Sequence, residues 1–331
     1  MKSARDVVQR LQVTELISER ACEVLEVRNR RRAADQDVAF GARPFILCGL
    51  PIRRLPAGTL TYRRQNGRFC LEIAGHADWG VPFGQDRLLI LFLATQAVRY
   101  QTREVRFRSG AELLVEWGMP TNGAHYARLV DGFRRVFGST IFFGTTDERS
   151  KAEVWHCSRA HFLDSMKLWL SDSGEKLTGR DNAVTLSHAF WQELQAHPIP
   201  IDAEVVRVLA RNPGCLDLYT WLTWRCHQSK GPERIPLFGT HGLVNQLGVQ
   251  VYSRERKFRE RISAWLKLVR LYWPECPAAI SSNGAFLEVD RASANIASTR
   301  PNKSSAGPST RTLLATVTSK TLGLYPRKEV Q

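Results

Sequence analysis

The sequence lacks the short motifs that mark most catalytic and metal sites. The dipeptide Gly-Lys does not occur, which excludes the phosphate-binding loop of the P-loop ATPases. The eight His residues form no His-x-His pair, and neither His-Glu-x-x-His nor Gly-x-Ser-x-Gly is present. The seven Cys residues are scattered without a Cys-x-x-Cys pair, so we expect reduced, mostly buried thiols. The sequence therefore predicts a protein with no enzymatic activity, no cofactor and no metal site.

Basic side chains on one predicted helix offer a different chemistry. Residues 253–273 have a helical period, and Phe258, Ile262 and Trp265 share the face that we expect to seat on a core. On the other faces, Arg can pair bidentately with guanine in the major groove, and Lys can neutralise phosphate. An ordinary solvated charged face is the alternative interpretation. The predicted DNA contacts of this helix are Ser253, Arg254, Arg256, Lys257, Arg259, Glu260 and Lys267.

A shorter predicted helix, Ala124–Phe137, presents a less basic face of the same kind. Its outward side carries Arg128, Asp131 and Arg135, with Arg134 at the flank. A surface for dimerisation explains this face as well as DNA binding does. We predict DNA contacts by Arg128, Arg134 and Arg135, and by Lys151 in the polar loop that follows.

The elements around these two helices repeat one order. In the first half, a strand over 103–107, a helix over 110–118, the helix over 124–137 and a hairpin around the loop 144–151 follow one another. In the second half, helices over 217–228, 236–248 and 253–273 precede a hairpin that turns at 281–284. Helix, turn, helix, hairpin is the order of a winged helix-turn-helix domain. The predicted fold is therefore α+β, mainly helical, with two tandem winged helix-turn-helix domains.

Other segments complete this predicted architecture. A helix over 3–32 ends in three Arg residues, and a hairpin over 59–74 turns at Asn66-Gly67, a pair that favours a type I′ turn. Residues 85–101 are apolar all round, as expected of a buried core helix. We predict an N-terminal helical extension (1–40), a first winged-helix domain (41–180), a second one (181–290) and a disordered basic tail (291–331).

The net charge of +15 and the pI near 9.9 indicate a polyanionic partner, either nucleic acid or an anionic membrane. No apolar run approaches the ~18–20 residues of a membrane helix. The first residues carry charges and lack the apolar stretch of a secretory signal. These features favour a cytoplasmic protein that binds nucleic acid and has no membrane partner.

Three stretches carry a resemblance to a known family: CGLPIRRLP (48–56), PFGQDRLLILFLATQAVR (82–99) and LDLYTWLTWRCH (216–227). Their order, and the LFGT, RKFRERI and LVRLYWP segments after them, resemble the RepA-type plasmid replication initiators. The resemblance implies two winged-helix domains that bind repeated origin sequences, called iterons, as duplex DNA. It also implies recruitment of host replication proteins, a homodimer that represses its own promoter, and a recognition helix over 253–267.

Two other functions fit part of this pattern. A winged-helix transcriptional regulator without a role in replication would show the same elements and charge. An RNA-binding protein fits less well, because RNA-reading domains usually expose aromatic side chains on a sheet. Here the aromatic residues fall in apolar, core-like patterns. Tandem repeats of ~20 bases beside the gene would distinguish an initiator from a regulator, because dimeric and tandem readers contact grooves about one helical turn apart.

Overall fold

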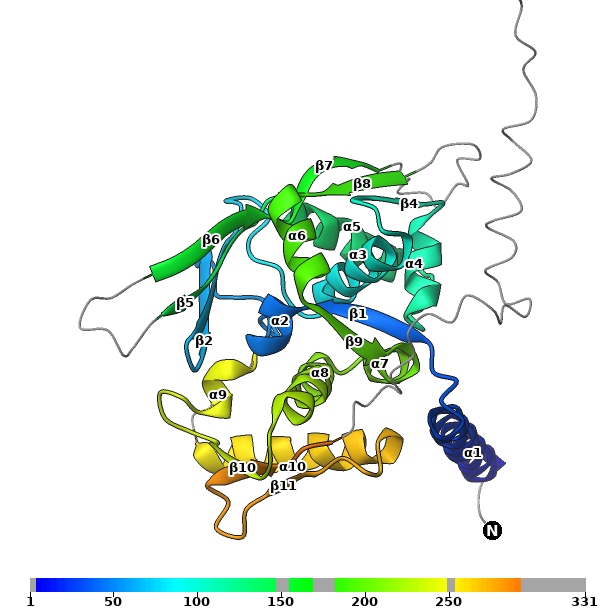
Figure 1. Ribbon diagram of the computed structural model, residues 1–331. Coiled ribbons are helices and arrows are strands. Elements are labelled where there is room, and N and C mark those ends of the chain that lie inside the picture. The colour runs from blue at the N-terminus through cyan, green and yellow to red at the C-terminus, as the bar shows by residue number, and fades with distance from the viewer. Residues whose placement is uncertain (1–3, 147–154, 169–181, 249–253, 293–331) are drawn as a thin grey trace, which may run out of the picture. The chain divides into compact units, whose positions relative to one another are not determined.

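A computed structural model describes residues 4–146, 155–168, 182–248 and 254–292, which belong to one compact unit (Figure 1). The described residues form ten helices and several antiparallel sheets, so the mixed α and β class predicted from the sequence is confirmed. None of the described helices combines the length and apolar character needed to cross a bilayer. Ser253, Lys151 and the predicted tail from residue 293 onward lie outside the described residues.

The N-terminal region reaches across to the middle of the chain. Helix α1 (Ala4–Arg32) confirms the predicted helix and is followed by strand β1 (Val38–Ala42) and the short helix α2 (Arg43–Leu47). Strand β1 pairs antiparallel with β9 (Pro198–Asp202), which lies between helices α6 (His188–Ala196) and α7 (Ala203–Leu209). This two-stranded sheet joins segments that are far apart in the sequence.

A four-stranded sheet contains the predicted hairpin. Its antiparallel order is β2 (Thr61–Asn66), β3 (Phe69–Ala74), β5 (Thr140–Thr146) and β6 (Trp155–His161). The predicted type I′ turn at Asn66-Gly67 is wrong, because Gly67 has a positive φ of 54° and Asn66 does not. Asn66 is instead the last residue of β2, and its side-chain amide donates a hydrogen bond to the carbonyl of Leu47. The two central residues of the turn are therefore Gly67 and Arg68, because Asn66 pairs with Phe69. A positive φ at only the first of these two residues is the pattern of a type II′ turn.

The first half contains a unit of three helices and three strands. The core helix α3 (Asp86–Tyr100) is buried on nearly all sides, as predicted. It is followed by β4 (Glu104–Phe107), α4 (Gly110–Glu116) and α5 (Gly123–Phe137), and, after β5 and β6 of the four-stranded sheet, by β7 (Leu163–Lys167) and β8 (Asn182–Leu186). The side chains of Ser109 and Asn122 cap α4 and α5. The three strands form an antiparallel sheet in the order β4-β8-β7.

The second half repeats this arrangement. Helix α8 (Pro213–Gln228) precedes β10 (Glu233–Pro236), α9 (Leu243–Gln246), α10 (Glu255–Tyr272), β11 (Ala278–Ile280) and β12 (Phe286–Val289). The strands again pair with the first beside the last, in the order β10-β12-β11. Gly284 adopts a φ of 66° in the turn between β11 and β12, where the sequence predicts a hairpin.

The hairpin predicted around residues 144–151 exists, but in another sheet. Strands β5 and β6 pair with each other and join β3, not β4. The reason is the apolar match between β3 and β5: Leu71 lies opposite Phe143, and Phe69 stacks on Phe143 with 6.0 Å between ring centroids. The hairpin that pairs with β4 is β7–β8. Because β8 lies beyond residue 180, pairing crosses the predicted domain boundary, and the division into domains stays a prediction.

Candidate nucleic-acid interface

Helix α10 buries the face that the sequence assigns to the core. Phe258, Ile262 and Val269 are fully buried, and Trp265 and Leu266 are at most 5% exposed. The helical period therefore predicts the orientation of this helix correctly. With this face fixed against the core, other side chains of α10 are exposed to solvent.

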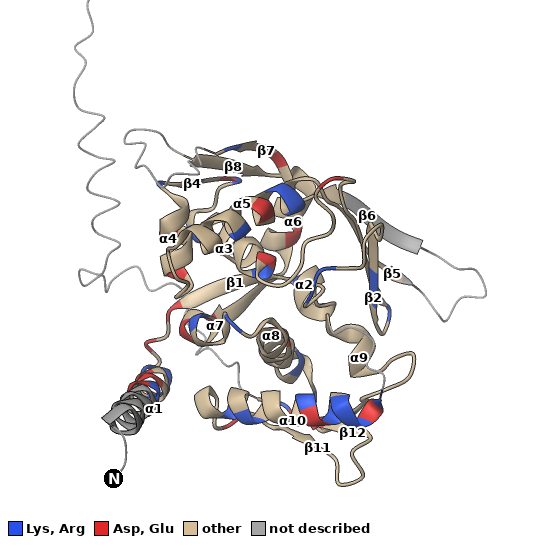
Figure 2. Ribbon diagram, turned by 180° about the vertical axis from the view of Figure 1, so that it is seen from behind, with Lys and Arg blue, Asp and Glu red and all other residues tan. Residues whose placement is uncertain are grey.

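The solvent side of α10 carries most of the predicted cations. The side chain of Arg256 is 85% exposed and forms an ion pair with Glu260 one turn along, at 2.9 Å. Arg254, Lys257 and Lys267 are also exposed, and the described structure gives them no ion pair. Figure 2 shows basic positions along much of α10, interrupted by acidic ones. Such a ridge can enter a groove of duplex DNA with guanidinium and ammonium groups foremost.

Arg259 has a different position. Its guanidinium pairs with Glu255 at 2.9 Å and lies 5.3 Å from the centre of the Phe238 ring. Its Cδ would lie 3.3 Å from a Cβ placed on Gly284, in the turn between β11 and β12. Arg259 therefore fixes α10 against the adjacent hairpin, which makes it a positioning residue for this surface.

Helix α5 has fewer exposed cations than α10. Arg128 is exposed, and Arg134 pairs with Asp131 at 3.1 Å on the surface. The outward orientation predicted for Arg135 is wrong: its guanidinium donates to both oxygens of Asp86, at 2.7 and 2.9 Å, and its side chain is only 14% exposed. Gly132 explains the error, because a Cβ there would lie 2.8 Å from Asp86, so its absence lets this carboxylate approach α5.

The three stretches that carry the family resemblance meet in the interior. Arg87 of the second stretch donates to the carbonyl of Leu50 in the first, at 2.8 Å. Its Nε lies 2.9 Å from Oδ1 of Asp217 in the third stretch, and both side chains are buried. Burial raises the pKa of Asp217 to about 7, and the nearby Arg87 opposes this shift.

The backbone at this junction is equally close-packed. The amide of Gly49 donates to the carbonyl of Gln246, and that of Ile52 donates to Gly248. A Cβ on Gly248 would lie 1.5 Å from the carbonyl oxygen of Leu50, so no other residue fits there. These contacts therefore join the two halves of the chain through the buried parts of the three stretches.

Some exposed cations near these elements were not among the predicted contacts. Arg261 lies on α10, and Arg53 and Arg54 follow the buried part of the first resembling stretch. No ion pair is described for any of them within the described ranges. The sequence did contain a signal for the exposure of Arg53 and Arg54, because two charged residues at the end of an apolar run usually mark the point where the chain returns to the surface.

The comparisons with known proteins bear on this arrangement. Residues 133–234 match the family of plasmid-encoded RepA proteins. The RepA-type resemblance is thereby confirmed. The RepA-type segment runs from the end of α5 to β10 and includes the LDLYTWLTWRCH stretch with Asp217.

Two solved structures are similar to this chain. The crystal structure of RctB domains 2-3 is 13% identical, with a TM-score of 0.47, and the alignment covers 74% of this chain and 94% of that one. A selenomethionine derivative of domains 2 and 3 of RctB is 14% identical, with a TM-score of 0.49 and coverages of 75% and 95%. No curated protein matches the chain.

Proposed function

We propose that this chain is a plasmid replication initiator that binds iterons as duplex DNA and recruits host replication proteins. The observation that carries the proposal is the exposed basic face of α10, on a chain that contains a RepA-type segment. A homodimer that represses its own promoter belongs to the same proposal. So does the lack of enzymatic activity, because initiators of this kind act by binding and not by turnover.

Each half of the chain is best described as a winged-helix unit. Both halves have the order helix, strand, helix, helix, strand, strand, once the inserted β5–β6 hairpin of the first half is set aside, and in both sheets the first strand lies beside the last. In a winged-helix domain the third helix enters the major groove, and the hairpin after it contacts the neighbouring backbone. These roles would fall to α10 and the β11–β12 hairpin in the second unit, and to α5 and the β7–β8 hairpin in the first.

Specificity should reside mainly in α10. Its guanidinium and ammonium groups are exposed, and the ion pair between Arg256 and Glu260 can be exchanged for a guanine edge at little cost because it lies in water. In α5, the guanidinium of Arg135 is held by Asp86, and that of Arg134 pairs with Asp131. Because the Arg134 pair also lies in water, Arg128 and Arg134 remain for the first unit, and Arg135 does not.

The test is the affinity of alanine variants for iteron and scrambled duplexes at one salt concentration. A base-contacting Arg contributes ~1–3 kcal/mol of discrimination, so Arg256→Ala should weaken iteron binding by about 10- to 100-fold more than scrambled binding. Arg106→Ala is the matched control, since Arg106 is also exposed and paired with a carboxylate, but lies on β4. The proposal fails if Arg128→Ala removes discrimination while Arg256→Ala leaves it intact.

A regulator without a role in replication is the second candidate, since it would bind duplex DNA in the same way. A small plasmid that carries only this gene and its flanking repeats distinguishes the two. An initiator maintains such a plasmid, and Arg256→Ala should abolish that maintenance. A regulator would repress a promoter beside its site but would not support replication.

A further inference from the structure

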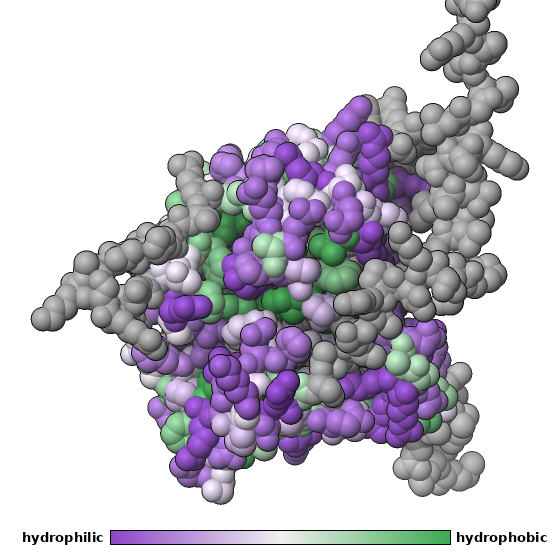
Figure 3. All heavy atoms as spheres, in the orientation of Figure 1, coloured by the Kyte–Doolittle hydropathy of each residue, from purple (hydrophilic) through white to green (hydrophobic). Residues whose placement is uncertain are grey.

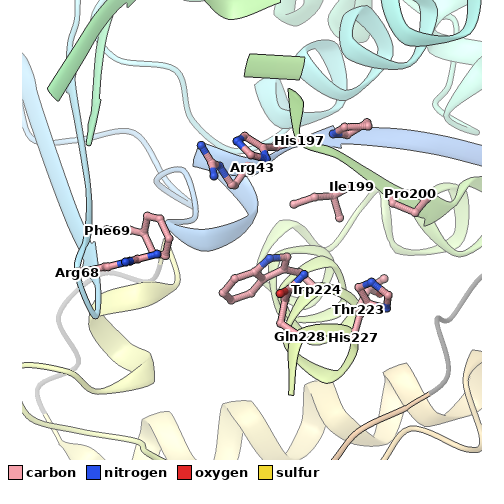
Figure 4. A pocket seen from close by; sticks show the side chains of 11 residues that line it. Arg43, Arg68, Phe69, His197, Ile199, Pro200, Thr223, Trp224, His227 and Gln228 are labelled. Carbon is pink, nitrogen blue, oxygen red and sulfur yellow. The ribbon is translucent and has the colours of Figure 1, made fainter. Parts of the chain in front are cut away.

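A cavity of about 370 Å³ opens beside the end of α8. Its walls come from α2, the β2–β3 turn and the start of β3, the junction of α6 with β9, β9 itself and the last turns of α8 (Figure 4). Figure 3 shows a mostly hydrophilic face on which apolar side chains gather in a hollowed region. The volume lies within the ~300–1,000 Å³ of typical small-ligand sites.

The lining is basic and contains no carboxylate. Arg43, Arg68, His197 and His227 contribute to it, and no Asp or Glu does. Behind the wall, Glu193 holds the guanidinium of Arg43 through two hydrogen bonds of 2.7 and 2.9 Å, which fix its position and offset its charge, so the main cation of the lining is Arg68. This charge pattern favours an anionic ligand.

Aromatic rings are the second feature of the lining. Trp224 belongs to the RepA-type segment but lies outside the buried core, and Figure 4 shows its ring at the cavity. Across from it, the guanidinium of Arg68 lies 5.2 Å from the centre of the Phe69 ring. The expectation that the aromatic residues serve only the core therefore misses Trp224. Aromatic rings and cations that line one cavity suit a planar, negatively charged partner.

The third wall excludes one kind of ligand. Strand β9 pairs with β1 on one side only, and Phe40, opposite Pro200, donates its amide to Thr95 instead of to β9. Positions 198 and 200 therefore turn their backbone toward the free edge, where proline has no N–H to donate. An extended peptide that adds as a further strand would find no donors at these two positions.

We propose that this cavity binds a nucleotide, whose base stacks on Trp224 and whose phosphate lies near Arg68. Stacking on an aromatic ring beside a cationic groove is how proteins hold bases without reading their sequence. The nucleotide is either one unit of a single DNA strand or a free molecule. The site goes beyond the proposed duplex binding by α10 and does not depend on it.

The experiment uses the full chain and a fluorescein-labelled 12-nucleotide oligothymidine, with fluorescence anisotropy as the readout. Loss of one stacking contact should weaken binding by about 5- to 100-fold, so Trp224→Leu and Arg68→Gln should both bind more weakly. Trp79→Leu and Arg106→Gln are the matched controls, with a half-exposed ring and an exposed cation outside the cavity. The far-UV circular dichroism spectrum of Trp224→Leu should match that of the unchanged chain, which shows that the variant is folded, and its duplex binding should be unchanged.

Competition with AMP identifies the source of the nucleotide. Displacement of the oligonucleotide by AMP supports a site for a free nucleotide, and retention supports a site for a strand. The proposal is overturned if Trp224→Leu and Arg68→Gln bind the oligonucleotide as the unchanged chain does. It is also overturned if a labelled oligoglutamate peptide binds and loses as much affinity with Trp224→Leu, because the cavity would then serve an acidic protein partner.

Discussion

Two buried Arg–Asp pairs show how differently cations of this chain are used. Arg87 with Asp217 and Arg135 with Asp86 are shielded from water, whereas the pairs on α10 are solvated. Breaking a buried pair leaves an uncompensated charge, while an exposed pair contributes little. Some Arg residues of this basic chain thus stabilise its interior, whereas the cations of α10 are exposed at the surface, where they are available for binding.

Removing Arg135 should therefore damage stability and not recognition. Arg135→Ala leaves the buried carboxylate of Asp86 unpaired, so we expect a loss of ~3–5 kcal/mol in the free energy of unfolding. Arg134→Ala removes an exposed pair on the same helix and should cost about 1 kcal/mol or less. Urea unfolding of both variants measures the difference. Equal, small losses would show that the pair with Asp86 is not important for the fold.

The raised pKa of Asp217 makes a prediction about pH. Because the pKa rises from an unfolded value near ~3.9 to about 7 on folding, the folded state binds the extra proton. The stability that this group contributes is fully present below about pH 4 and is lost as the pH rises through 7. Asp217→Asn removes this dependence. The difference in the free energy of unfolding between the unchanged chain and Asp217→Asn, measured by urea unfolding, should therefore narrow from pH 5 to pH 8. A gap that widens instead would mean that Arg87 lowers this pKa more than burial raises it.

At the scale of elements, the sequence predicts what is local and misses what depends on pairing. The periods of α3 and α10 assign their buried faces correctly, because helix burial follows from residues a few positions apart. The partner of β4 could not be predicted, since the choice between β5–β6 and β7–β8 rests on contacts such as that of Leu71 with Phe143. The inward orientation of the Arg135 side chain could not be predicted either, because its partner Asp86 lies far away in the sequence.

The pairing of β4 changes which loop should act as the first wing. The loop that carries Lys151 follows β5, but the hairpin that joins β4 is connected through residues 168–181, which contain Lys176 and Arg180. We predict that Lys176→Gln with Arg180→Gln lowers duplex affinity about threefold or more at low salt, as expected for lost phosphate contacts. The matched control is Arg149→Gln with Lys151→Gln, which should have a smaller effect. Mobility-shift titrations compare the two double variants, and the reverse order of effects would restore the original prediction.

For the whole molecule, the net charge of +15 should appear as a salt dependence. Each phosphate contact contributes about −0.9 to the slope of log affinity against log salt concentration, so several contacts give a slope of several units. Lys267→Gln should reduce the magnitude of that slope by about one and weaken iteron and scrambled duplexes alike. Titrations over a range of salt concentrations measure it. A flat dependence in the unchanged chain would exclude duplex binding through exposed cations.

The pairing of β1 with β9 has a consequence for synthesis on the ribosome. Roughly 160 residues separate the two strands, so at ~5–20 residues per second β1 waits on the order of ten seconds or more for its partner. During that time its edge is open to pairing with other chains. The N-terminal region cannot mature as an independent early product, and successful folding in the cell depends on protecting β1 until the middle of the chain emerges.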